Sequence, residues 1–138
     1  MRKVVISSDL GLDKEKILLL SKFCNFCSKF LEISSPFQIF VVSDRAGHGI
    51  ETTAAYQRNA GIIKIYGKNR ALVDVCRSIA HELVHLMQDE NGMLVGVNQD
   101  AGGDIEDEAN AKAGEIIKRF AKSSEDNRGI YEGSNCPD

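Results

Sequence analysis

The stretch His81-Glu82-Leu83-Val84-His85 is the most informative part of this sequence, because it has the form H-E-x-x-H. On a helix, residues four apart lie on one face, so both imidazoles can bind one Zn²⁺. Glu82 would then stand beside the metal as a candidate general base. Because the chain has only three His in 138 residues, such a match is expected by chance only roughly 0.005 times. We therefore predict a zinc site of the hydrolase type here, and the alternative is a coincidental pair of surface histidines.

The residues around this motif predict the helix that carries it. Apolar side chains recur at helical spacing and form one face: Leu72, Val75, Cys76, Ile79, Leu83, Leu86 and Met87. The two histidines fall on another stripe, together with Asp74, Ser78 and Gln88. Asn69 is the expected N-cap, and Asn91-Gly92 is the expected stop. We expect a helix of about 20 residues whose apolar face is buried.

A catalytic zinc site needs a third protein ligand and leaves a fourth position for water. The metzincin extension of the motif is excluded, because it requires Gly and His where this chain has Gln88 and Asn91. His48 lies upstream in a glycine-containing loop and would reach the metal only through the fold. A downstream carboxylate is favoured, and the acidic segment 104–110 supplies several.

Helical periodicity separates these carboxylates. An inward stripe predicts a second helix that runs to about Lys122: Ile105, Ala109, Ala113, Ile116, Ile117 and Phe120. Glu106 projects within roughly 50° of the centre of that stripe, whereas Glu108 lies roughly 110° away and Asp107 points to solvent. Glu106 is therefore the predicted third ligand and Glu108 the reserve. The alternative for Glu106 is that it only complements the helix dipole.

His-Glu-x-x-His followed by Glu-x-x-Ala-Asn at residues 106–110 is similar to the gluzincin metallopeptidases. These include thermolysin-like enzymes, CAAX prenyl proteases and small cytoplasmic peptidases that act on phage repressors or stress regulators. The resemblance covers about residues 61 to 121. It implies one Zn²⁺ per chain, held by His81, His85 and Glu106, with Glu82 as the general base. Asn110 would be an outer partner that fixes an imidazole tautomer.

Length and composition, with 43% hydrophobic and 27% charged residues, predict one globular domain over residues 1–122. We expect an α+β, zincin-like fold, in which a small mixed or antiparallel sheet packs on the H-E-x-x-H helix and the glutamate helix. Residues 123–138 are expected to form a flexible tail, although Ile130 and Tyr131 could dock it. The other expected elements are strands at 4–6, 37–42 and 61–67, a helix at 13–31, and a loop or irregular hairpin at 43–60 that contains His48.

The resemblance also suggests where a substrate would lie. In gluzincins the strand before the zinc helix runs along the cleft and pairs with an extended peptide. The candidate substrate strand is Ile63, Lys64, Ile65 and Tyr66. The alternative is an ordinary sheet edge on which Lys64 guards against aggregation.

The function implied is hydrolysis of a peptide or protein substrate by a zinc-activated water, with Glu82 taking a proton and passing it to the leaving amine. The candidate oxyanion donors, not separable by sequence, are His48, Tyr56, Tyr66 and Tyr131. One alternative is a catalytically silent, zinc-stabilised binding or regulatory module of the same fold. Another is a scaffold without metal that happens to carry the motif.

Charge and cysteine usage bound the remaining classes of function. A net charge of −3 and a pI near 5.6 argue against nucleic-acid binding. No signal peptide or membrane-spanning run is recognised, so the expected location is cytoplasmic, and the oligomeric state is left open. Cys24 and Cys27 form a CxxC inside a helical pattern, where buried reduced thiols are favoured over a redox pair or half a zinc site. Cys76 is expected in the core, and Cys136 lies in the polar tail.

Overall fold

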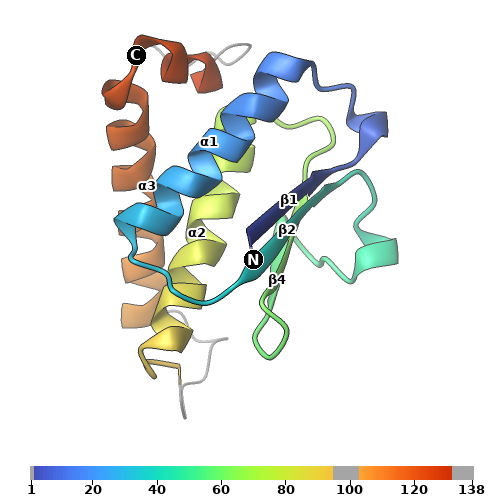
Figure 1. Ribbon diagram of the computed structural model, residues 1–138. Helices are drawn as coiled ribbons and strands as arrows, with labels where there is room; N and C mark the ends of the chain where they lie inside the picture. The colour runs from blue at the N-terminus through green and yellow to red at the C-terminus, as the bar shows by residue number, and fades with distance from the viewer. Residues whose placement is uncertain (1, 95–102, 132–138) are drawn as a thin grey trace.

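The computed structural model describes residues 2–94 and 103–131 as an α+β domain with a four-stranded mixed sheet (Figure 1). Its strands are β1 (Arg2–Ile6), β2 (Phe37–Val42), β3 (Ala54–Gln57) and β4 (Ile62–Tyr66). Its α-helices are α1 (Lys14–Phe30), α2 (Leu72–Glu90) and α3 (Asp104–Ser123). Short 3₁₀ segments are η1 (Ser8–Leu10), η2 (Ala46–His48) and η4 (Glu125–Tyr131). The expected elements are therefore present, with bounds that differ by a few residues at most.

The sheet has the order β1-β2-β4-β3. β1, β2 and β4 run parallel, and β3 is antiparallel to β4 at one edge. A mixed sheet was one of the two expected forms. Residues 43–60 were expected as a loop or irregular hairpin containing His48; His48 lies in η2 of this segment, and β3 forms a hairpin with β4, which lies beyond it. The hairpin turn ends at Gly61, whose φ of 62° favours glycine. A Cβ at Gly61 would also lie 2.9 Å from the carbonyl oxygen of Pro36.

The core lies between the sheet and the helices. Ile39 of β2 and Ile63 and Ile65 of β4 are fully buried, as expected for central strands. On the helical side, the rings of Phe23 and Phe120 meet edge to face with centroids 5.1 Å apart. Among the described residues, no helix has both the length and the apolar character needed to cross a bilayer.

Three cysteines belong to this core, as predicted for Cys24, Cys27 and Cys76. All three are buried free thiols. Burial raises the pKa of each of them, which keeps the thiol protonated and unreactive at neutral pH. Cys136 lies outside the described residues.

Helix α2 is the central element, since it packs on β3 and β4 on one side and on α3 on the other (Figure 1). The expected N-cap, Asn69, is wrong: the cap is Ala71, which uses no side chain. Asn69 instead has a φ of 59° in the turn after β4, a left-handed conformation that Asn tolerates well. The expected stop is confirmed, because Asn91 is the C-cap and Gly92 has a φ of 73°.

The ordered domain extends to Tyr131, past the boundary expected at residue 122. The segment η4 packs on α1, α2 and α3, with Ile130 completely buried. Asn127 donates from Nδ2 to the carbonyl oxygen of Phe120 at 3.1 Å, which ties η4 to the end of α3. Ile130 and Asn127 thus both anchor this otherwise polar segment. Residues 132–138, the rest of the expected flexible tail, lie outside the described part of the chain.

Candidate metal centre

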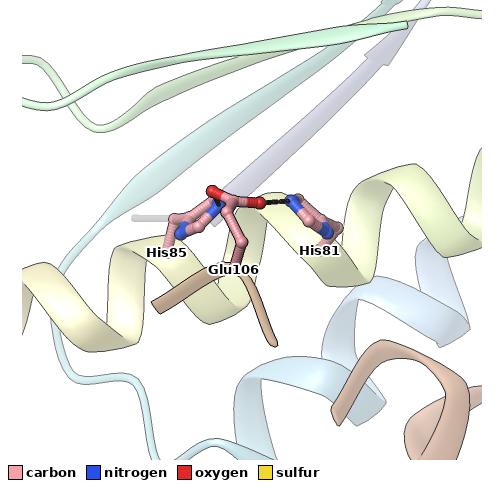
Figure 2. A group of neighbouring side chains, drawn as sticks. All are labelled: His81, His85 and Glu106. Atoms are coloured by element: carbon pink, nitrogen blue, oxygen red, sulfur yellow. Dashed lines mark hydrogen bonds and ion pairs between the residues drawn. The ribbon is translucent and has the colours of Figure 1, made fainter. Parts of the chain in front are cut away.

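Helix α2 presents His81 and His85 on one face, and the first turn of α3 places Glu106 opposite them (Figure 2). Glu106 Oε1 lies 3.0 Å from His81 Nε2, and Glu106 Oε2 lies 3.0 Å from His85 Nε2. The two Nε2 atoms are 3.2 Å apart. The assignment of Glu106 to the inward face of its helix is thus confirmed. All three side chains are partly buried, with 13–30% of their surface exposed.

These three residues have the spacing of a metal-ligand set. Zinc bonds to imidazole nitrogen and carboxylate oxygen of about 2.0–2.1 Å place tetrahedral ligands about 3.3 Å apart. The separations of 3.0 to 3.2 Å fall close to that value. Two imidazoles and one carboxylate also match the donor set of catalytic zinc sites, which leave a fourth position open. The residues present therefore fit a zinc ion.

The tautomer of His85 is set by the buried side chain of Gln88. Gln88 Nε2 donates to the carbonyl oxygen of Ile105 at 3.0 Å and to Glu108 Oε1 at 2.8 Å. Because both partners are acceptors, the amide orientation is fixed and Gln88 Oε1 faces His85 Nδ1 at 2.8 Å. His85 Nδ1 must therefore carry the proton. This leaves the lone pair of Nε2 directed at the other two ligands.

A cation is the natural occupant of the space between these atoms. With its Nδ1 protonated, neutral His85 brings an acceptor to 3.0 Å from Glu106 Oε2, and two acceptors at that distance repel each other. One proton could relieve that contact. Two imidazolium groups with nitrogens 3.2 Å apart would repel each other. Protonating both histidines would therefore not stabilise the three side chains in this arrangement. One divalent ion would satisfy all three groups at once.

His81 is held in the neutral form that binds metal. Burial is the main cause that lowers its pKa, and the neighbouring His85 lowers it further. Glu106 and a side-chain hydrogen bond with Asn110 act in the opposite direction. Asn110 thus contacts a ligand, as expected of an outer partner, and it borders the same hollow as His81.

Glu82 stands beside the ligand set without belonging to it. Its Oε2 lies 3.9 Å from His81 Nε2, and only 13% of its side chain is exposed. Burial raises the pKa of Glu82 to about 7; the charge of His85 lowers it and the carboxylate of Glu106 raises it. A carboxyl group with a pKa near neutrality can both accept and release a proton at physiological pH.

The cluster opens into a hollow of about 420 Å³. His81, Glu82 and Asn110 line one side of this hollow, and Thr52, Thr53 and Ala54 at the start of β3 line the other. Its far end is polar and carries Arg70, Asp74, Arg77 and Ser78 of the turn before α2 and of α2 itself. We call this hollow the metal-site pocket.

The structure corrects the expected substrate strand. Ile63, Lys64, Ile65 and Tyr66 belong to β4, which pairs with β2 on one side and β3 on the other, so its backbone has no free edge. The alternative, a sheet edge guarded by Lys64, fails for the same reason. The strand at the edge next to the metal-site pocket is β3. Local sequence pattern could not reveal this, because it does not encode the order of strands in a sheet.

The candidate oxyanion donors do not line the metal-site pocket. Tyr56 donates its hydroxyl to Asp89 Oδ2 at 2.8 Å, and Tyr66 stacks under the guanidinium of Arg45. His48 lies in η2 and is absent from the ligand cluster, and Tyr131 borders a different hollow. The polar groups that do line the pocket, Arg70 and Arg77 among them, were not singled out from the sequence.

The role of Gln88 was not predicted from the sequence, although the residue falls on the histidine stripe. The usable signal was a polar side chain three residues after His85, on the same face of the helix. Glu108, the reserve ligand, lies behind Gln88 and accepts its hydrogen bond.

Replacing Gln88 with the similarly shaped Met should weaken zinc binding by about 10- to 100-fold, because His85 loses the acceptor that fixes its tautomer. The replacement should also lower the melting temperature, since the Ile105 carbonyl and Glu108 lose a buried donor. Competition with a chromophoric chelator measures the affinity. Wild-type zinc affinity in a folded Gln88→Met protein would contradict the role assigned to this amide.

Comparisons of this chain with protein-family models, with curated proteins and with solved structures found no match.

Proposed function

We propose that this protein is a zinc-dependent metallopeptidase of the gluzincin type, with a zincin-like arrangement of sheet and helices. The observation that carries the proposal is the position of Glu82, a largely buried carboxyl group beside the three-ligand cluster. A purely structural zinc site has no requirement for such a group. Burying this carboxylate costs free energy, and the opposing attraction of His85 leaves its pKa raised to about 7.

His81, His85 and Glu106 would hold the ion, with Gln88 and Asn110 orienting the imidazoles. When bound in such a site, zinc supplies a water of lowered pKa and polarises a carbonyl. The protein contributes the base. Glu82 accepts a proton at its carboxylate and returns it to the leaving amine, and any cation held between the histidines favours the carboxylate form that begins the cycle.

The free edge of β3 is the candidate platform for the polypeptide. No strand of the described part of the chain pairs with its outer side. An extended peptide added to this edge would run past residues 52–54, which share the metal-site pocket with His81 and Glu82. A carbonyl of such a peptide would then face the ligand cluster. In this proposal β3, and not residues 63–66, is the strand that pairs with the substrate.

The proposal predicts that purified protein without an affinity tag contains about one zinc per chain and cleaves peptides only when it is loaded. A library of internally quenched peptides and a denatured protein are suitable substrates. Removal of the metal by a chelator should abolish cleavage, and one equivalent of zinc should restore it. Cleavage that persists without metal, or protein that binds no divalent ion tightly, would refute the proposal.

A further inference from the structure

A second and larger hollow, of about 870 Å³, lies beyond the metal-site pocket. It is lined by Gly114, Ile117, Lys118, Ala121 and Lys122 of α3 and by Arg77 of α2, and η4 closes its far side. We call it the α3–η4 groove. The buried side chains of Ile117 and Ala121 give it an apolar floor.

A row of α3 residues leads from the candidate ligand to the α3–η4 groove. Glu106, Asn110, Gly114, Lys118 and Lys122 follow one another at four-residue steps, and each step turns by about 40°, so the row winds around the helix. Arg77 of α2 borders both hollows. The two hollows are therefore adjacent, with Arg77 between them.

The rim of the groove is cationic although the chain carries a net charge of −3. The cationic residues that line it are Arg77, Lys118, Lys122 and Arg128, and its one carboxylate is Glu125. Arg77 is already paired with Asp74 at 2.8 Å, and Arg128 has interactions of its own, so Lys118 and Lys122 are the charges offered to a partner. Lys118 and Lys122 are exposed and one helical turn apart, where like charges repel, and neither forms an ion pair with any residue that the structure describes. These charges are arranged for an anionic partner.

Gly114 lines the α3–η4 groove. It lies in the interior of α3, where glycine is less favourable than alanine. A Cβ built at Gly114 meets no atom within 4 Å, so packing within the described part of the chain does not require a glycine. The missing side chain instead leaves room above the helix, at the point where a bound chain would cross it.

We propose that the α3–η4 groove binds an acidic segment of the polypeptide substrate and directs the neighbouring segment into the metal-site pocket. This inference rests on the proposed peptidase function. The apolar floor suits aliphatic side chains between the carboxylates, and the groove joins a sheet edge suited to an extended peptide.

Binding can be tested apart from hydrolysis, on full-length protein freed of metal. The probe is a fluorescein-labelled ten-residue peptide of alternating Glu and Ala, compared with its Lys and Ala counterpart by fluorescence anisotropy at low ionic strength. The acidic peptide should bind at least about 10-fold more tightly. Lys118→Glu should weaken its binding by about 10-fold or more. The matched control, Lys22→Glu on the exposed side of α1, should leave it unchanged.

A second variant separates binding from folding. Gly114→Ala should raise the melting temperature by about 3 °C, because alanine has the higher helix propensity. It should nevertheless weaken binding of the acidic peptide several-fold, because the added methyl group occupies part of the groove. Equal binding of both peptides overturns the proposal, as does full affinity in either groove variant. So would an oligonucleotide or an anionic phosphatidylserine vesicle that binds through Lys118 while the acidic peptide does not bind. The binding measurement uses protein without metal, so it does not depend on hydrolysis. If the acidic peptide binds but the zinc-loaded protein does not cleave peptides, the peptidase proposal fails and the groove proposal stands.

Discussion

Glu106→Ala is expected to weaken zinc binding by about 100-fold or more, because it removes a direct ligand. Loss of an outer partner typically costs about 10- to 100-fold in affinity, and a group that touches the metal should cost at least as much. Both oxygens of Glu106 face the histidines at 3.0 Å, so no part of its carboxylate is directed elsewhere in the cluster. Metal competition titrations on the folded variants measure the effect.

Two neighbouring carboxylates serve as controls for Glu106. Asp107→Ala removes the same charge from the same first turn of α3, and it should leave zinc affinity near wild type. That result would exclude the dipole interpretation of Glu106. Glu108→Ala should cost about 10-fold at most, since Glu108 acts only through Gln88. If Glu108→Ala were the more damaging change, the ligand would be Glu108 and the helical-face argument would fail.

Helical periodicity predicted the meeting of His81, His85 and Glu106 well because the geometry of a helix is local. Residues four apart lie on one face of a helix whatever the rest of the fold does, so the side chains of His81 and His85 lie next to each other once the helix forms. Glu106 needed one further assumption, namely that its helix packs with its apolar stripe against the histidine helix. The structure bears this out, since Ala109 and Ala113 of that stripe are buried.

The features that the sequence did not predict depend on tertiary contacts. β4 looked like a substrate strand because it precedes the zinc helix, but β3 folds back on it and takes its outer edge. Gln88 is a fully buried polar residue, and its role exists only because Ile105 and Glu108 approach from another helix. Cross-helix hydrogen bonds of this kind follow from packing and leave no periodic trace in the sequence.

Glu82→Gln is expected to lower peptide turnover by about 10² to 10⁴, the range typical for loss of a positioned base. Glutamine keeps the size of the side chain and removes its basicity. Zinc content should stay near one per chain, because Glu82 is outside the ligand cluster. The melting temperature should stay the same or rise, since the neutral amide avoids the desolvation that raises the pKa of Glu82 to about 7.

The same variant distinguishes a peptidase from a catalytically silent binding module. A binding module would hold its metal equally well with or without a carboxylate at residue 82, and neither form would cleave peptides. The decisive measurement is the cleavage rate of wild type and of Glu82→Gln on one quenched peptide, with zinc loading verified in both. We predict rapid cleavage by wild type and a rate lower by about 10² or more in the variant. Equal rates in the two fully loaded proteins would contradict the hydrolytic role of Glu82 and leave the binding module in its place.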